Sequence, residues 1–357
     1  MSSLVPLPPS ADKLKVNSRQ IGIWVVMGIV IAIVAVFLPQ GFDYVHVFSV
    51  HAVPVFFVPW TDGLLYLLSW PILVSLTIMS LVVAIHHYGG PKWLLILAIF
   101  SLPTIWVLLL GALEGITLWG ILLLSYAVPV NLLDRLHLRN RRWWITLGLF
   151  IAATAIAAAI LIRDQGPNYH FANSTVLGSQ PQIGVALALL LPWVVPLVLL
   201  RPQLAAFALL ARRSWLIVGV LWILLSIIVW GIWPPALLLK VTPDLKAAQP
   251  QNVSLFPWSL LFALPMLWWS RRDPDMLMAA GSFIAPSVIP YYYMILLPSL
   301  ARLPVGYALL CWASSFLPLT ANYFGPSWWL TANVFPLLIW LGLWWQRQTA
   351  QLAALAV

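Results

Sequence analysis

The sequence contains few charged residues: only 8% of its 357 residues are Asp, Glu, Lys or Arg, and nine are acidic. Soluble domains contain about 25% charged residues. Hydrophobic residues make up 62% of the chain, and its mean hydropathy is +0.97. A water-soluble core cannot bury that much apolar surface. The composition therefore excludes a soluble globular protein and predicts an integral membrane protein whose solvent is the lipid bilayer.

Cysteine and nucleotide-binding motifs are also scarce. The single cysteine, Cys311, excludes a disulfide framework and a thiolate metal site. The sequence has no P-loop, no GxGxxG after a strand and no HExxH, so ATP-driven transport by this chain alone is excluded and no cofactor is predicted. The net charge of +9 comes from basic residues that lie singly or in pairs between apolar runs. This pattern indicates contacts with membrane lipids and no nucleic-acid partner.

What the sequence does contain is a series of apolar runs, each long enough to cross a membrane. We predict an all-α polytopic bundle of about 10–11 transmembrane helices, with kinked and short broken pieces. It occupies residues 20–347, between a cytoplasmic N-terminal tail (1–19) and a C-terminal tail (348–357). Prolines such as Pro71, Pro103 and Pro265 are expected to kink the spans that contain them. The expected spans are 21–38, 63–85, 93–110, 115–133, 143–162, 183–200, 214–238, 254–270, 276–300, 304–320 and 327–345.

Two apolar pieces fit this series less simply. The piece at 203–211 is too short to cross alone, and 276–300 is either one span or two pieces broken between Pro286 and Pro290.

The distribution of Lys and Arg sets the orientation of the chain in the membrane. A cytoplasmic N-terminus places 13 of the 18 basic residues inside, Arg201 among them. It places Asp43, Glu114 and Arg302 on the outer side of a membrane that we expect to be the bacterial plasma membrane.

Five stretches, taken in chain order, resemble the polytopic glycosyltransferases of the GT-C class, in particular the GT87 or DUF2029 family. The resemblance covers about residues 20–320. It implies a GT-C-like fold and transfer of a hexose or pentose, with inversion, from a polyprenyl-phosphate sugar to an acceptor on the outer face. The stretches are Phe42-Asp43-Tyr44; Val55 to Trp60; Ser101-Leu102-Pro103 followed by Gly111 to Gly115; Arg201-Pro202-Gln203 with Arg212 to Trp215; and Ala285-Pro286-Ser287 with Tyr291 to Tyr293.

Asp43 is the candidate catalytic residue. It follows the first span directly, where a carboxylate can stay charged and still reach lipid-bound material. As general base it would accept a proton from the acceptor hydroxyl while that oxygen attacks the anomeric carbon. A direct displacement needs only one such base, because phosphate leaves without a strong acid. The alternative is a solvated acid in a glycine-containing turn.

Other polar residues are candidate substrate-binding residues, each with a structural alternative. His46 and His51 are able to donate to the donor phosphate, and their alternative is an interfacial position. A metal site built from Asp43 and these histidines is a weak signal, and we predict none. Arg163, His170 and Arg302 are candidates for binding the donor phosphate, Glu114 for contacting the acceptor and Tyr292 for stacking on the sugar ring. Their structural alternatives are an arginine that reaches the lipid headgroups, an acid at a helix N-terminus and an aromatic residue at the membrane interface.

Two alternative functions stay open at this stage. The first is a catalytically inactive GT-C-like subunit or scaffold with membrane-protein partners. It is motivated by Ala112 and Glu114, which stand where the family carries an amide, and by a short first outer loop. The second is a transporter or flippase of a lipid-linked substrate, motivated by the kinked helices.

Overall fold

A computed structural model describes residues 17–45, 61, 68–127, 194–230 and 251–355. Within these ranges the chain forms helices and no strand, as the sequence predicts. Three helical stretches are long and apolar enough to cross a membrane: α1 (Ser18–Ala35), α3 (Trp70–His87) and the stretch Pro326–Ala353. The last combines the 3₁₀ helix η6 (Pro326–Asn333) with α19 (Val334–Leu355).

A fourth crossing is formed if α4 (Lys92–Ile99) and α5 (Leu102–Leu110), which meet at an angle of 54°, make one broken span. Several other expected spans appear as shorter helices. For example, the 11 residues of α15 (Leu260–Ser270) reach about 17 Å, against a hydrocarbon core of about 30 Å. The remaining helices are α6 (Glu114–Ala127), α10 (Val195–Val198), α11 (Pro202–Ala208), η3 (Leu209–Ala211), α12 (Arg213–Trp230), α17 (Val305–Ser314), η5 (Leu317–Thr320) and α18 (Ala321–Phe324).

Pro71 was expected to kink a span but lies in the first turn of α3, whereas the expected span 93–110 does bend, by 54°, just before Pro103. Pro71 and Pro103 each lie at the second residue of their helix, α3 and α5 respectively. A first-turn residue has no intrahelical acceptor for its N–H, so proline loses nothing there and its fixed φ suits the helix. Pro265 does lie inside α15, as expected.

The expected span 276–300 consists of two helices that form a hairpin, in agreement with the alternative of two pieces. It consists of α16 (Pro274–Ile284) and the 3₁₀ helix η4 (Pro290–Arg302), broken between Pro286 and Pro290. The two arms begin and end at one base, because Arg302 at the end of η4 pairs with Asp273, the N-cap of α16. Nearly every side chain of both arms is buried, which is the pattern of an element surrounded by protein.

Hydrogen bonds hold the tip of this hairpin. Ser254 Oγ donates to the Ala285 carbonyl at 2.6 Å, and the Val288 N–H donates to Asn252 Oδ1 at 3.0 Å. Asn333, at the end of η6, donates to the Val253 carbonyl at 2.8 Å. The segment 252–254 therefore fixes the tip directly, and Asn333 holds that segment in place.

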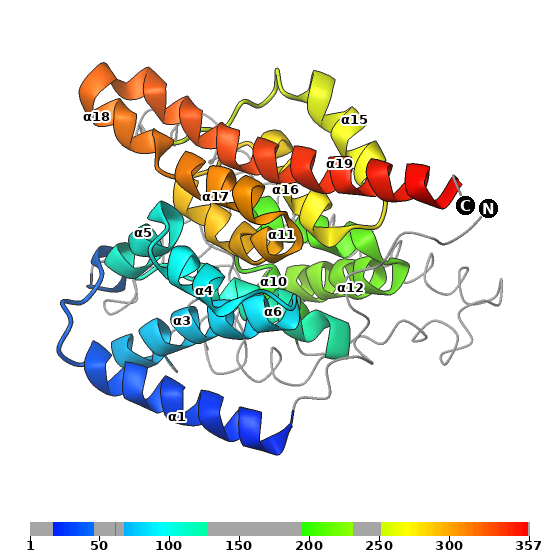
Figure 1. Cartoon of the computed structure of the whole chain (residues 1–357). Coiled ribbons are helices and arrows are strands. Elements are labelled where there is room, and N and C mark those ends of the chain that lie inside the picture. The colour runs from blue at the N-terminus through cyan, green and yellow to red at the C-terminus, as the bar shows by residue number, and fades with distance from the viewer. Residues whose placement is uncertain (1–16, 46–60, 62–67, 128–193, 231–250, 356–357) are drawn as a thin grey trace, which may run out of the picture.

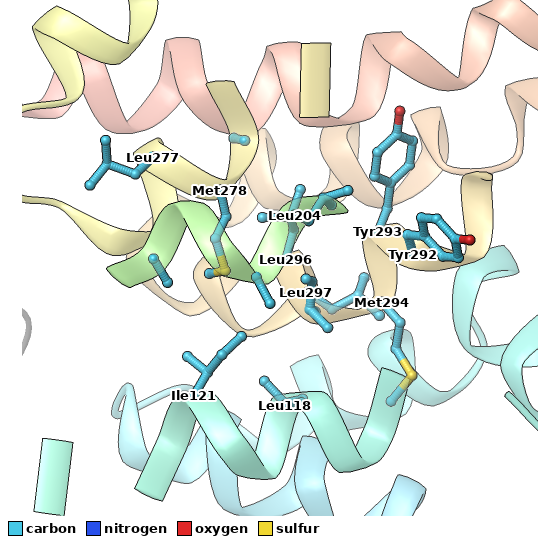
Figure 2. Close-up of a cluster of buried hydrophobic side chains, with 14 of the residues drawn as sticks. Leu118, Ile121, Leu204, Leu277, Met278, Tyr292, Tyr293, Met294, Leu296 and Leu297 are labelled. Atoms are coloured by element: carbon cyan, nitrogen blue, oxygen red, sulfur yellow. The ribbon is translucent and has the colours of Figure 1, made fainter. Parts of the chain in front are cut away.

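Tight apolar packing surrounds the arms of this hairpin. Gly281 of α16 lies so close to the ring of Phe207 in α11 that a Cβ would overlap it. Figure 2 shows the buried cluster, in which Leu118 and Ile121 of α6 and Leu204 of α11 face residues of the hairpin arms. The hairpin thus forms the centre of the described structure.

The long apolar helices lie at the edges. Figure 1 shows α1 running along α3 at one edge and α19 at the opposite edge, with α16 and α11 between them. Only 6% of the α1 window is buried, although its side chains are apolar. A helix that is apolar all round and packed on a single neighbour is suited to contact with lipid. The arrangement leaves the start of α6, the start of α11 and the tip of the hairpin to meet in the interior.

Candidate functional site

Two glycines position Asp43. The helical turn that carries it follows Gly41, whose Cα lies against the backbone of Leu110 and Gly111 with no room for a Cβ. Gly111 ends α5 with a φ of +75°, a conformation that glycine adopts without strain. The neighbouring Tyr44 ring packs on Trp70, 5.5 Å between centroids. Asp43 is therefore held, half-buried, beside the connection between α5 and α6.

Glu114 begins α6 and is fully buried. The helix packs closely on α3, because Gly115 leaves no room for a Cβ against Thr77. Glu114 Oε1 lies 2.9 Å from Arg201 Nε, and the two side chains are 0% and 5% exposed. An acid in the first turn is favoured by the helix dipole, but a buried carboxylate also needs a partner. Arg201 is that partner, so Glu114 is one half of a buried ion pair.

Arg201 is the N-cap residue of α11, in the Arg-Pro-Gln sequence. The following proline takes the first helical position, where its missing N–H costs nothing. The Arg201 guanidinium lies over the ring of Tyr292, 5.2 Å from its centroid, which is cation–π geometry. Tyr292 and Tyr291, near the tip end of η4, are buried and meet edge to face at 4.9 Å. We call Asp43, Glu114, Arg201, Tyr291 and Tyr292 the Asp43 cluster.

The charges of the Asp43 cluster act on one another. Burial raises the pKa of the Asp43 carboxyl above its usual value, and the Arg201 guanidinium opposes that rise. Several polar atoms here are buried and have no hydrogen-bond partner among the described residues: Glu114 Oε2, Gln203 Oε1 and Trp70 Nε1. Buried polar atoms are normally paired, so these atoms indicate a place for water or a polar ligand.

The cluster combines a half-buried carboxylate, a buried guanidinium and two aromatic rings. Such a set can remove a proton, balance a negative charge and stack on a sugar ring. No known family model, curated protein or solved structure matches this chain. The resemblance to GT-C enzymes therefore remains a prediction, and the chemistry of the cluster stands on its own residues.

Three of the predicted site residues come together in this cluster: Asp43, Glu114 and Tyr292. Arg201 is the residue that the sequence interpretation missed, because the charge count assigned it to the side opposite Glu114. That assignment is wrong, since the two side chains form an ion pair. The helix that Arg201 begins, α11, has seven residues and is too short to cross a membrane by itself. The Arg-Pro-Gln sequence was the available signal.

Arg302 does not belong to the Asp43 cluster. Its guanidinium donates to Asp273 at 2.9 and 2.6 Å and to Asp275 at 2.5 Å, and Tyr88 donates to Asp275 at 2.8 Å. Arg347 of α19 lies 3.6 Å from Asp273. Tyr88 follows α3 directly, whereas Asp43 lies near Trp70 at the start of α3, about 27 Å away along the helix. The expectation that Arg302 shares a face with Asp43 is therefore wrong.

This second group, the Arg302 cluster, has matched charges: two carboxylates and two guanidiniums. Although burial raises the pKa of Asp273, its hydrogen bonds and charge interaction with Arg302 hold that pKa below its usual value. The cluster joins α3, both arms of the hairpin and α19, so its evident role is structural. The other predicted site residues, His46, His51, Arg163 and His170, lie outside the described residues. The residues that are described contain no group of three acidic, histidine or cysteine side chains able to hold a metal ion.

Proposed function

We propose that this protein is a membrane glycosyltransferase with a GT-C-like helical bundle. It transfers a sugar from a polyprenyl-phosphate donor to an acceptor on the outer face of the membrane. The observation that carries the proposal is the meeting of Asp43 with Arg201 and Tyr292, from three segments far apart in sequence. These segments are also three of the stretches that resemble the family.

In this mechanism Asp43 is the general base. Its carboxylate accepts the proton of the acceptor hydroxyl while that oxygen forms a bond to the anomeric carbon. The bond between the anomeric carbon and the phosphate oxygen breaks, and the electron pair leaves with the polyprenyl phosphate. Arg201 balances the negative charge of the phosphate, since guanidinium suits phosphate oxygens. The tyrosines offer faces on which a sugar ring can stack.

The decisive experiment uses the purified chain in lipid nanodiscs with a panel of polyprenyl-phosphate hexoses and pentoses. We expect Asp43→Ala and Asp43→Asn to lower sugar transfer at least about 100-fold, which is the usual contribution of a general base. Lys92→Gln removes an exposed charge at the start of α4, outside the stretches that resemble the family, and serves as the control, with unchanged transfer expected. Unchanged activity in both Asp43 variants would refute the proposed base.

A result with no transfer from any donor would favour the alternative of an inactive GT-C-like subunit. The Glu114–Arg201 pair is the observation that keeps this alternative in view, because Arg201 already has a carboxylate partner. Its specific signature would be co-purification of a membrane-protein partner. Movement of a labelled lipid-linked sugar between liposome leaflets, without transfer, would instead support the flippase alternative.

A further inference from the structure

The Asp43 cluster has more negative than positive charges, and this excess opposes the binding of an anionic ligand. It holds two carboxylates, Asp43 and Glu114, and one guanidinium, Arg201. Among the described residues, the other titratable groups that face Glu114 are Tyr291 and Tyr292. Both are neutral phenols. The other titratable residues of α3, His86 and His87, lie at its far end. With both acids ionised, these described residues carry a net charge of −1, and Glu114 and Arg201 are buried.

A phosphodiester would add a second negative charge beside Arg201. Burying uncompensated charge is costly, and two carboxylates near one anion do not both stay ionised. Arg302 and Arg347 cannot compensate, because they lie in the Arg302 cluster about 20 Å along η4 from Tyr292. The described residues also supply no three-ligand group for a metal ion.

Glu114 is positioned to remove this excess of negative charge by taking up a proton. It is fully buried, and Arg201 is its ion-pair partner. If a phosphate oxygen pairs with the Arg201 guanidinium in place of Glu114, the Glu114 carboxylate is left buried beside Asp43. The neutral acid is then the more stable form of Glu114. Asp43 stays available as the base, because it is only half-buried.

We propose that an anionic lipid phosphate binds here by replacing Glu114 as the ion partner of Arg201, and that Glu114 takes up one proton from water as it does so. This inference rests on the proposed function, since it concerns the donor of that reaction. Each site therefore binds one anion and one proton. Glu114 acts as a positioning residue that holds Arg201 in place until the donor arrives.

The probe is prenyl methyl phosphate, a phosphodiester that keeps one negative charge from pH 5 to 9. Its binding to the chain in nanodiscs is measured calorimetrically in buffers that differ in ionisation enthalpy, so that proton uptake is counted directly. We expect up to one proton taken up per ligand and a Kd that rises by up to about tenfold per pH unit. In Glu114→Gln both effects should disappear, and binding at high pH should become tighter.

Asp275→Asn is the matched control, because it removes one carboxylate at the other end of the hairpin and should leave the pH slope unchanged. If Glu114→Gln does not fold, proton uptake that persists in Asp43→Asn assigns the proton to Glu114, and loss of uptake in Asp43→Asn overturns the inference. Binding without pH dependence or proton uptake overturns this inference and leaves the proposed function standing. Binding that needs a divalent cation and takes up no proton overturns it too. Absence of binding at every pH overturns both.

Discussion

The Glu114–Arg201 ion pair gives the sharpest prediction about the stability of this protein. Two unit charges 3 to 4 Å apart attract by about 4 to 6 kcal/mol at an effective dielectric constant of about 20. Glu114→Ala leaves a buried guanidinium without its main partner, and such changes cost about 3 to 5 kcal/mol. Because Asp43 also lies near Arg201, we expect the lower end of that range.

The reverse change, Arg201→Met, leaves Glu114 buried without a cation. Its cost should be smaller, because a carboxyl group can take up a proton whereas a guanidinium stays charged. The double variant Glu114→Ala with Arg201→Met removes both charges. It should recover at least about 2 kcal/mol relative to the sum of the single variants, since a buried pair exchanged for apolar residues is often close to neutral.

Unfolding titrations in mixed detergent micelles measure these free energies, and the fluorescence of the 22 tryptophans reports the transition. Arg213→Gln is the control, because that guanidinium is exposed and its loss should change stability by less than about 0.5 kcal/mol. Single variants that each cost less than about 1 kcal/mol, or a double variant equal to their sum, would show that the pair is not buried as described.

Three further predictions follow from individual contacts. Gly41→Ala pushes the turn that carries Asp43 off the end of α5, so sugar transfer should fall about 100-fold, whereas Gly22→Ala, which has open space around it, should leave the rate unchanged. Gly281→Ala should cost about 1 to 3 kcal/mol by overlap with Phe207, and trimming that ring in Phe207→Leu should recover part of the loss in the same unfolding titration. The lowered pKa of Asp273 stabilises the fold above the unfolded value of about 3.9 and loses that effect as the pH falls through the folded value. The midpoint of thermal unfolding should therefore drop in acid, and Asp273→Asn should make it less sensitive to pH there.

Several features of the fold are predictable from local sequence because their causes are local. Long apolar runs indicate α1 and α3, and the helical stretch Pro326–Ala353 follows from the same signal. Pro286 and Pro290 mark the break between the two arms of the hairpin. The signal fails where short helices replace crossings, as in α11, since hydropathy measures whether a segment is apolar and not whether protein or lipid surrounds it.

For the candidate site, the amino-acid sequence is enough to identify Asp43 as a rare acid at the end of an apolar helix. It also shows that the chain has no nucleotide motif and no disulfide framework. The partners of Asp43 become visible only in the folded chain, which places Arg201 beside Glu114 and Tyr292 and places Arg302 at the other end of the hairpin. A charge inside a membrane protein pairs with a counter-charge that is close in space, whatever their separation in sequence. Residues 114 and 201 meet because the folded helices bring them together, which their separation in sequence does not indicate.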